Sequence, residues 1–281
     1  MIDPAWIGLC LTGRIGNKTL QALLKHFDGD TSAILQADTK ALRQVSGVGP
    51  KIAQNIQEID LRQVEKALAR WQQSGIHIWT IRDSQYPERL KTLDDAPPTL
   101  FVRGNVSFTF ERSIAIVGTR SPSNEMRNFA QNLSTALVEK GYSIISGMAL
   151  GIDSAAHFGA LGVPDGQTAA VLGSGIVNIY PPAHERLARE IMVQGLVLSE
   201  ISPNATTSPS NLVARNRIIS GLSEGLIVVE TSVDGGAMHA ARFASLQGRT
   251  LYTVESQASG NQALIGAGAT VIPMNLAQLP F

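Results

Sequence analysis

Four glycine- or serine-rich turns in the second half of the chain have the residue types that bind phosphate. Each follows a short apolar segment, and they are Gly118-Thr119-Arg120, Ser146-Gly147-Met148, Gly173-Ser174-Gly175 and Asp234-Gly235-Gly236. Small residues let phosphate oxygens approach backbone N–H groups, and a helix that begins at such a turn adds positive potential. One turn of this kind could be an ordinary strand-to-helix connection. Four of them indicate a phosphate-bearing ligand.

Arginines supply the side-chain charge that such a ligand needs. Arg120 ends the first turn, and its planar guanidinium suits a phosphate. Arg215-Asn216-Arg217 precedes an apolar segment further along the chain. On a helix, Arg215 and Arg217 would diverge by about 200°. We therefore expect one of them to face the ligand and the other to pair with an internal carboxylate such as Glu200 or Glu230.

Asp153 and His157 are one helical turn apart, so the spacing predicts a hydrogen-bonding pair on one helix. No second histidine or cysteine lies near them in the sequence, so we predict no metal site. The first turn does not have the G-x-G-x-x-G spacing of a dinucleotide site, and the chain contains no G-x-x-x-x-G-K-[ST] loop. We predict no cofactor.

The turns need a scaffold, and the apolar pattern predicts one. Short, continuously apolar segments alternate with helical patterns. The expected strands are 114–117, 143–145, 169–172, 196–198, 226–229 and 250–254, and the expected helices are 129–138, 152–161, 185–193 and 236–246. This alternation predicts an α/β fold with a doubly wound parallel sheet. Ligands of such sheets bind beyond the carboxyl ends of the strands, where all four turns would lie.

Residues 1–75 instead have the pattern of short helices. Gly47-Val48-Gly49 lies between two of them, followed by Pro50 and Lys51, which is typical of a helix-hairpin-helix turn. Such a turn can hold one DNA phosphate, with Gly47, Gly49 and Lys51 as the candidate contacts. A protein-interaction domain with plain glycine turns fits the pattern equally well. Residues 76–105 form a proline-containing connector with an edge strand, and 106–281 form the sheet domain.

The composition excludes several classes of protein. The chain has 281 residues, with 23 basic and 23 acidic side chains, so its net charge of zero excludes a polycation that coats DNA by charge alone. Charged residues make up only 16%, which argues against disorder. Cys10 is the single cysteine, so no internal disulfide can form. No apolar run spans a membrane and no signal peptide is recognisable, so we predict a cytoplasmic protein without membrane contact.

Several motifs together resemble the DNA-processing protein A (DprA, or Smf) family. They occur in the family's order and are Ala115-Ile116-Val117-Gly118-Thr119-Arg120, Ser146-Gly147-Met148-Ala149-Leu150-Gly151-Ile152-Asp153, Ala170-Val171-Leu172-Gly173-Ser174-Gly175, Tyr180-Pro181, Leu198-Ser199-Glu200 and Arg215-Asn216-Arg217-Ile218-Ile219-Ser220-Gly221. The resemblance implies an extended Rossmann-like DNA-binding domain, preceded by a small all-α helix-hairpin-helix or SAM-like domain. It implies a divergent member without the C-terminal winged helix of many relatives.

The resemblance also implies a function without catalysis. The protein would form a homodimer through the Rossmann domain, protect incoming single-stranded DNA and load a recombinase during natural transformation. Its phosphate pocket would be built by four sets of residues, namely Gly118, Thr119 and Arg120; Ser146 and Gly147; Gly173, Ser174 and Gly175; and Arg215, Asn216 and Arg217. Gly235 and Gly236 are added as candidates from their glycine turn alone, because the family has a different sequence there. The family often has a basic or aromatic residue just before Arg-Asn-Arg, and this chain has neither. Base stacking could come from Phe243, Tyr180 or Tyr252.

Two other functions remain open at this point. One is a sensor of a small nucleotide signal, as in Rossmann-like domains of defence systems. The other is a hydrolase of nucleoside monophosphates related to the lysine-decarboxylase-like group. Asp234-Gly235-Gly236 resembles the Pro-Gly-Gly loop of that group. In that group's pattern a glutamate and a threonine would stand where this chain has Arg242 and His239. Glu200 or Glu230 would have to replace the missing carboxylate.

Overall fold

The computed structural model describes residues 2–13 and 15–281, which group into two compact units. The first unit is Met1–Phe101 and the second is Val102–Phe281. The division into residues 1–75, 76–105 and 106–281 that we expect from the sequence stays a prediction. Within the described ranges, no helix is both long and apolar enough to cross a membrane.

The first unit consists mostly of short helices. Its elements are α1 (Pro4–Leu11), α2 (Asn17–His26), α3 (Thr31–Gln36), α4 (Thr39–Leu42), α5 (Pro50–Gln57), α6 (Leu61–Gln73), β1 (His77–Thr80), α7 (Glu88–Lys91) and the start of β2 (Thr99–Gly104). Aspartates at 3, 30, 38 and 60 cap four of the helices by accepting hydrogen bonds from first-turn N–H groups. The core includes Trp6, whose indole N–H donates to Thr99 Oγ1 at 3.0 Å.

The turn between α4 and α5 has the geometry that its glycines allow. Gly47 has a φ of +84°, a left-handed conformation that glycine adopts without strain. Gly49 is the N-cap of α5, and Pro50 is its first residue. Val45 and Val48 are buried, whereas Lys51 is exposed beside this helix start. The turn therefore presents a helix N-terminus and a cation on the surface.

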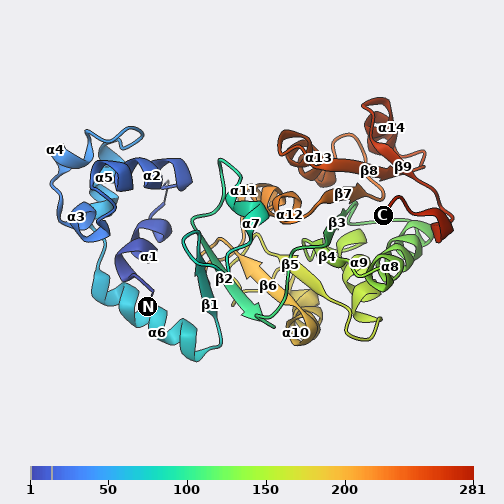
Figure 1. Ribbon diagram of the computed structural model, residues 1–281, viewed down its shortest axis with the longest axis horizontal. Coiled ribbons are helices and arrows are strands. Elements are labelled where there is room, and N and C mark those ends of the chain that lie inside the picture. The colour runs from blue at the N-terminus through green and yellow to red at the C-terminus, as the bar shows by residue number, and fades with distance from the viewer. Residues whose placement is uncertain (1, 14) are drawn as a thin grey trace. The chain divides into compact units, whose positions relative to one another are not determined.

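The second unit is a parallel sheet with helices on both faces (Figure 1). Strand β2 ends in this unit, and the order continues as β6-β5-β4-β3-β7-β8-β9. The bounds of these strands are β3 Ser113–Val117, β4 Ser143–Ser146, β5 Thr168–Val171, β6 Leu196–Ser199, β7 Gly225–Val228, β8 Thr250–Val254 and β9 Thr270–Ile272. All pairs from β6 to β9 are parallel. The strand order reverses direction at β3, which pairs with β4 on one side and β7 on the other.

Helices cover the sheet, with α9 and α10 on one face and α12 and α13 on the other (Figure 1). The helical segments are α8 Asn124–Glu139, α9 Ile152–Leu161, η1 Pro182–His184, α10 Glu185–Gln194, α11 Pro209–Ala214, α12 Asn216–Leu222, α13 Gly236–Leu246, α14 Ser259–Gly266 and η2 Leu276–Gln278. Strands β3 to β7 are wholly buried, as expected for continuously apolar segments between two helix layers.

Helices α8 and α9 pack closely because α9 presents small side chains to α8. Gly159 is the tightest point, since a Cβ there would lie 2.1 Å from the Gln131 carbonyl oxygen. Two side-chain hydrogen bonds cross the same contact, from Ser134 Oγ to Ala156 O at 2.6 Å and from Thr135 Oγ1 to Gly159 O at 3.0 Å. This contact fixes α9, which begins at Ile152 beside the pocket turns, against α8.

The predicted fold class is confirmed: a doubly wound, Rossmann-like parallel sheet follows a small helix-hairpin-helix domain. The expected strands and helices of the sheet domain all occur, within a few residues at their ends. The elements expected from the sequence do not include α11, α14 or β9. These segments are short, and glycine and polar residues interrupt their apolar pattern.

Candidate nucleic-acid interface

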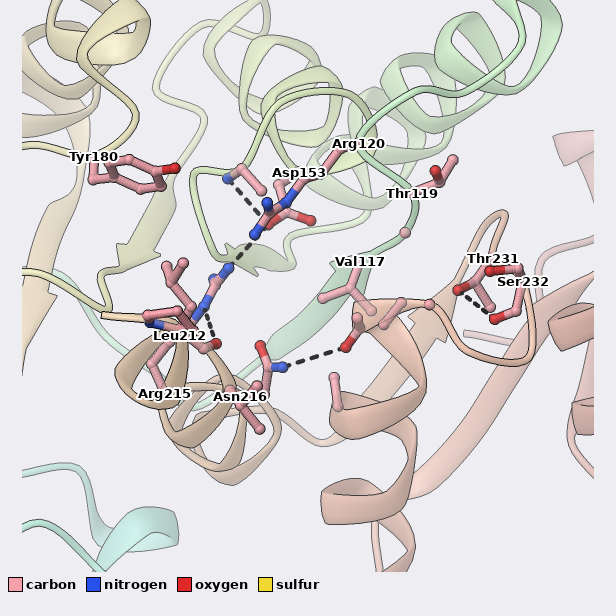
Figure 2. A pocket seen from close by; sticks show the side chains of 18 residues that line it. Val117, Thr119, Arg120, Asp153, Tyr180, Leu212, Arg215, Asn216, Thr231 and Ser232 are labelled. Carbon is pink, nitrogen blue, oxygen red and sulfur yellow. Dashed lines mark hydrogen bonds and ion pairs between the residues drawn. The ribbon is translucent and has the colours of Figure 1, made fainter. Parts of the chain in front are cut away.

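A pocket of about 590 Å³ opens where strands β3 and β7 end, at the reversal of strand order (Figure 2). This is the position where doubly wound sheets bind their ligands. Its lining comes from five segments that are far apart in the chain, and comprises Val117, Gly118, Thr119, Arg120, Ala149, Asp153, Tyr180, Pro209, Leu212, Val213, Arg215, Asn216, Thr231, Ser232, Gly235, Gly236, Ala237 and Ala240.

The first wall is the turn after β3, which Glu230 holds at both ends. The Thr119 N–H donates to the Glu230 carbonyl at 2.7 Å, and the Ser123 N–H donates to the Glu230 carboxylate at 3.2 Å. Gly118 allows the turn to lie against α9, because a Cβ there would be 2.5 Å from Ile152 Cγ1. Arg120 projects from this fixed turn with an exposed side chain.

The start of α13 forms the opposite side of the pocket. Gly235 is the N-cap of this helix, and Gly236 and Ala237 begin its first turn. A Cβ at Gly236 would meet no atom within 4 Å, so the backbone there is open to the cavity. Asn216 Nδ2 donates to the Gly236 carbonyl at 3.5 Å, which joins α12 to this turn. The first-turn N–H groups and the helix dipole make this side suited to an anion.

A buried ion pair lies under the pocket. Arg215 is 6% exposed and Asp153 is 3% exposed, with 3.6 Å between Arg215 Nη2 and Asp153 Oδ2. Arg215 also donates to the Leu212 carbonyl (Figure 2) and to the Val171 carbonyl, each at 3.3 Å. A Cβ at Gly147 would lie 1.1 Å from Arg215 Nη1. Gly147 therefore acts by leaving room for the guanidinium.

Burial controls the ionisation of this pair. Burial raises the pKa of the Asp153 carboxyl, although Arg215 and the N–H groups of Ala149 and Gly147 favour its charged form. Burial also lowers the pKa of Arg215, and the charge of Asp153 opposes that change. Each charge thus depends on the other, and the charge of the nearby Arg120 also lowers the pKa of Arg215.

The two arginines of Arg-Asn-Arg have different surroundings. Arg215 lines the pocket, whereas Arg217 lies outside its lining and forms an ion pair with Glu200. Both arginines therefore form ion pairs, Arg215 with Asp153 at the pocket and Arg217 with one of the two expected carboxylates, and the ligand-facing role of Arg215 stays a prediction. Asn216, between them, also lines the pocket.

Four other sequence-predicted residues lie behind the pocket wall instead of in it. Ser146 is fully buried and donates to the Ile116 carbonyl at 2.6 Å. Gly173 packs against the backbone at Leu212, Gly175 packs against Pro203, and Ser174 between them is buried. These small residues let the chain segments that carry Leu212 and Arg215 come close to the ends of β4 and β5.

The expected pairing of Asp153 with His157 is wrong. Asp153 interacts with Arg215 and the Ala149 N–H, at the start of α9. His157 lies one turn further into the core, where its Nδ1 is 2.7 Å from Thr168 Oγ1. Their i and i+4 spacing places both on the buried side of α9, but with different neighbours. Burial, with smaller contributions from His184 and Arg215, lowers the pKa of His157 to about 3.

This histidine should make folding sensitive to acid. With a folded pKa of about 3 and an unfolded value near 6.5, only the unfolded chain takes up the proton as the pH falls between these values. Stability should therefore fall below pH 6.5, by about 2.5 kcal/mol between pH 7 and pH 4.5. Urea unfolding across this range should show that this loss is absent in His157→Gln. If the free energy of unfolding changes with pH equally in both proteins, His157 does not cause the loss, because the two proteins share all other titrating groups.

Several lining residues were not predicted. Leu212, Val213 and Pro209 come from α11, and Thr231 and Ser232 come from the loop after β7. Ser208 followed by Pro209 is an N-cap and first-turn pair, so it could have indicated this short helix before Arg215. Among the described lining residues, Asp153 is the only carboxylate; Glu200 and Glu230 lie outside the lining.

The model of the family described as DNA recombination-mediator protein A matches residues 77–279. The chain belongs to this family. Its description names a mediator of recombination and not an enzyme. A second model, of a SAM-like helix-hairpin-helix tandem, matches residues 14–59 and so covers the Gly47 turn.

Three members of the family are similar to this chain over most of their own length. The DNA processing protein DprA of Bacillus subtilis is 33% identical over 94% of this chain and 91% of its own. The crystal structure of DprA from Streptococcus pneumoniae aligns over 100% of this chain and 99% of its own, with a TM-score of 0.85 and 29% identity. DprA from Helicobacter pylori aligns over 70% of this chain and 91% of its own, with a TM-score of 0.63 and 27% identity, and its structure is described as showing a single-stranded DNA binding mode.

Proposed function

We propose that this protein binds single-stranded DNA in the pocket between β3 and β7, protects it, and loads a recombinase onto it during natural transformation. The observation that carries the proposal is the placing of Arg120. Its exposed guanidinium lies over a pocket that has the Arg215–Asp153 ion pair below it and an open helix N-terminus at Gly236. Together these groups favour a phosphate.

The charge distribution supports a local site instead of a coated surface. The chain as a whole has no net charge, so a strand would be held by the few cations and N–H groups that face the pocket. Such contacts bind the DNA backbone and do not read its sequence. A relative with single-stranded DNA binding in its description supports this ligand class.

Replacing Arg120 by alanine should weaken binding of labelled oligo-dT about tenfold, because one guanidinium–phosphate contact is lost. The slope of log affinity against log salt should fall by about 0.7, the value of one single-strand phosphate. Fluorescence anisotropy at several salt concentrations measures both quantities. The matched control is Arg189→Ala, which removes an exposed arginine from α10, outside the pocket.

A duplex of the same sequence should bind more weakly than the single strand. If Arg189→Ala reduces affinity as much as Arg120→Ala, binding is a general charge effect and the pocket is misassigned. If the folded protein binds no strand but a nucleotide raises its melting temperature, the pocket serves a small nucleotide signal. These outcomes separate the main proposal from the sensor alternative.

Family membership supports the remaining parts of the proposal. The recombinase would receive the bound strand from a homodimer that forms through the Rossmann-like unit. In the first unit, Gly47, Gly49 and Lys51 would contact a further phosphate. Gly47 forms a left-handed turn, Gly49 caps the start of α5, and Lys51 is an exposed cation beside it. In the pocket, Thr119, Asn216, Gly235 and Gly236 would contact the strand beside Arg120.

A further inference from the structure

The pocket has an apolar margin that a phosphate does not need. A small cavity of about 40 Å³ adjoins it and shares Arg120, Tyr180, Leu212 and Arg215 with it. The remaining lining of this cavity includes Leu150 and Pro181. The two arginines are therefore shared by both cavities, and Leu150, Tyr180, Pro181 and Leu212 add an apolar edge beside them.

Tyr180 is the prominent residue of this margin. It is the one aromatic side chain among the described residues that line either cavity, and it is 38% exposed. Figure 2 shows it at the opposite side of the pocket from Thr231 and Ser232. Leu150 beside it is 47% exposed. An exposed aromatic ring and an exposed leucine at a binding pocket can pack against a flat apolar group of a ligand.

The surroundings hold Tyr180 in place. The chain after it turns through η1, where the His184 N–H donates to the Pro181 carbonyl at 2.9 Å. His184 Nδ1 then lies 2.8 Å from the Met148 carbonyl, which ties this segment to the loop that covers Arg215. The ring is thus presented from an anchored segment, so binding a partner there would require little ordering of the protein.

The other two candidate aromatics are less suited. Tyr252 packs against Phe281, with 4.7 Å between ring centroids. Phe243 is half-buried on α13 and lines neither cavity. The structure therefore distinguishes three residues that the sequence left equal.

We propose that Tyr180, with Leu150 and Leu212, forms a stacking site for one unpaired nucleobase of the strand whose phosphates Arg120 holds. This inference rests on the proposed function. It adds that Arg120 contacts the phosphates of the strand and that Tyr180 contacts a base. A paired base is stacked within its duplex and cannot enter, so the site favours single strands. Every base has a flat face, so the site tolerates any sequence.

The test compares two probes of equal length and charge, oligo-dT and an oligomer of abasic deoxyribose phosphates. The intact protein should bind oligo-dT about tenfold more tightly, because only this probe has a base to stack. Tyr180→Ala should bind oligo-dT about tenfold more weakly and the abasic oligomer unchanged. Tyr180→Phe should keep the preference. Phe158→Ala is the matched control, since Phe158 is 45% exposed but lies outside both cavities.

The outcomes separate this inference from the proposed function. If Tyr180→Ala leaves oligo-dT binding intact while Arg120→Ala weakens it, the strand site stands and the stacking site is overturned. If Tyr180→Ala weakens both probes equally, the residue supports the pocket without contacting a base, which also overturns the inference. If Arg120→Ala changes neither probe, the proposed function itself fails.

Discussion

Replacing Arg215 by methionine should lower the free energy of unfolding by about 3 kcal/mol at neutral pH. The change keeps most of the volume but leaves Asp153 buried without its ion-pair partner, and breaking a buried pair typically costs 3–5 kcal/mol. Two hydrogen bonds, to the Leu212 and Val171 carbonyls, are lost as well. Urea unfolding followed by circular dichroism measures the effect, and binding of oligo-dT should be lost at the same time.

The pH dependence of this loss identifies its cause. Burial already raises the pKa of Asp153, and removing Arg215 raises it further. A group whose pKa is raised on folding stabilises the protein below its unfolded pKa, and that stability is lost as the pH rises. The deficit of Arg215→Met should therefore be larger at pH 8 than at pH 5. Adding Asp153→Asn should remove this pH dependence and restore part of the stability. A deficit that is equal at both pH values would assign the effect to packing alone.

The second large effect is expected at Gly159, where α9 meets α8. In Gly159→Ala, the new Cβ would lie 2.1 Å from the Gln131 carbonyl oxygen and 2.8 Å from Ser134 Cβ. The better helix propensity of alanine contributes at most about 1 kcal/mol, whereas overpacking of this kind costs about 1–3 kcal/mol. Because the closest atom is backbone, the helices must separate. We expect a net loss of about 2 kcal/mol in urea unfolding.

Gly266→Ala is the matched control for this substitution. Gly266 is also helical, at the end of α14, but a Cβ there meets no atom within 4 Å. The same chemical change should therefore be neutral or stabilise the protein by up to about 0.5–1 kcal/mol. If both variants lose the same stability, glycine matters in these helices for a reason other than the close approach of α8 and α9.

Much of the fold could be predicted because the sheet domain has a simple pattern. Segments such as 114–117 and 226–229 are continuously apolar, as strands between two helix layers must be. The turns that follow them were correctly placed at the carboxyl edge of one sheet. The switch point then brings Arg120 and Gly236 to one pocket, although they are far apart in the chain.

The arrangement within the site could not be predicted, because it depends on packing between distant segments. The glycines at 147, 173 and 175 look alike in the sequence, yet the first accommodates a guanidinium and the others accommodate backbone. Spacing alone showed that Arg215 and Arg217 diverge, but not which of them would be buried beside Asp153. Similarly, nothing in the sequence distinguished the exposed ring of Tyr180 from the packed ring of Tyr252.

The shared space of Gly147 and Arg215 has a consequence for how such chains can evolve. The guanidinium occupies the volume in which any side chain at position 147 would begin, with 1.1 Å between Arg215 Nη1 and an added Cβ. A larger residue at position 147 therefore fits only after Arg215 has been replaced. Replacing Arg215 first destabilises the protein, because Asp153 is then buried without its ion-pair partner. Either order of change therefore passes through a destabilised intermediate. We therefore expect the three positions to be inherited as a set, and to change together in lineages that have given up this pocket.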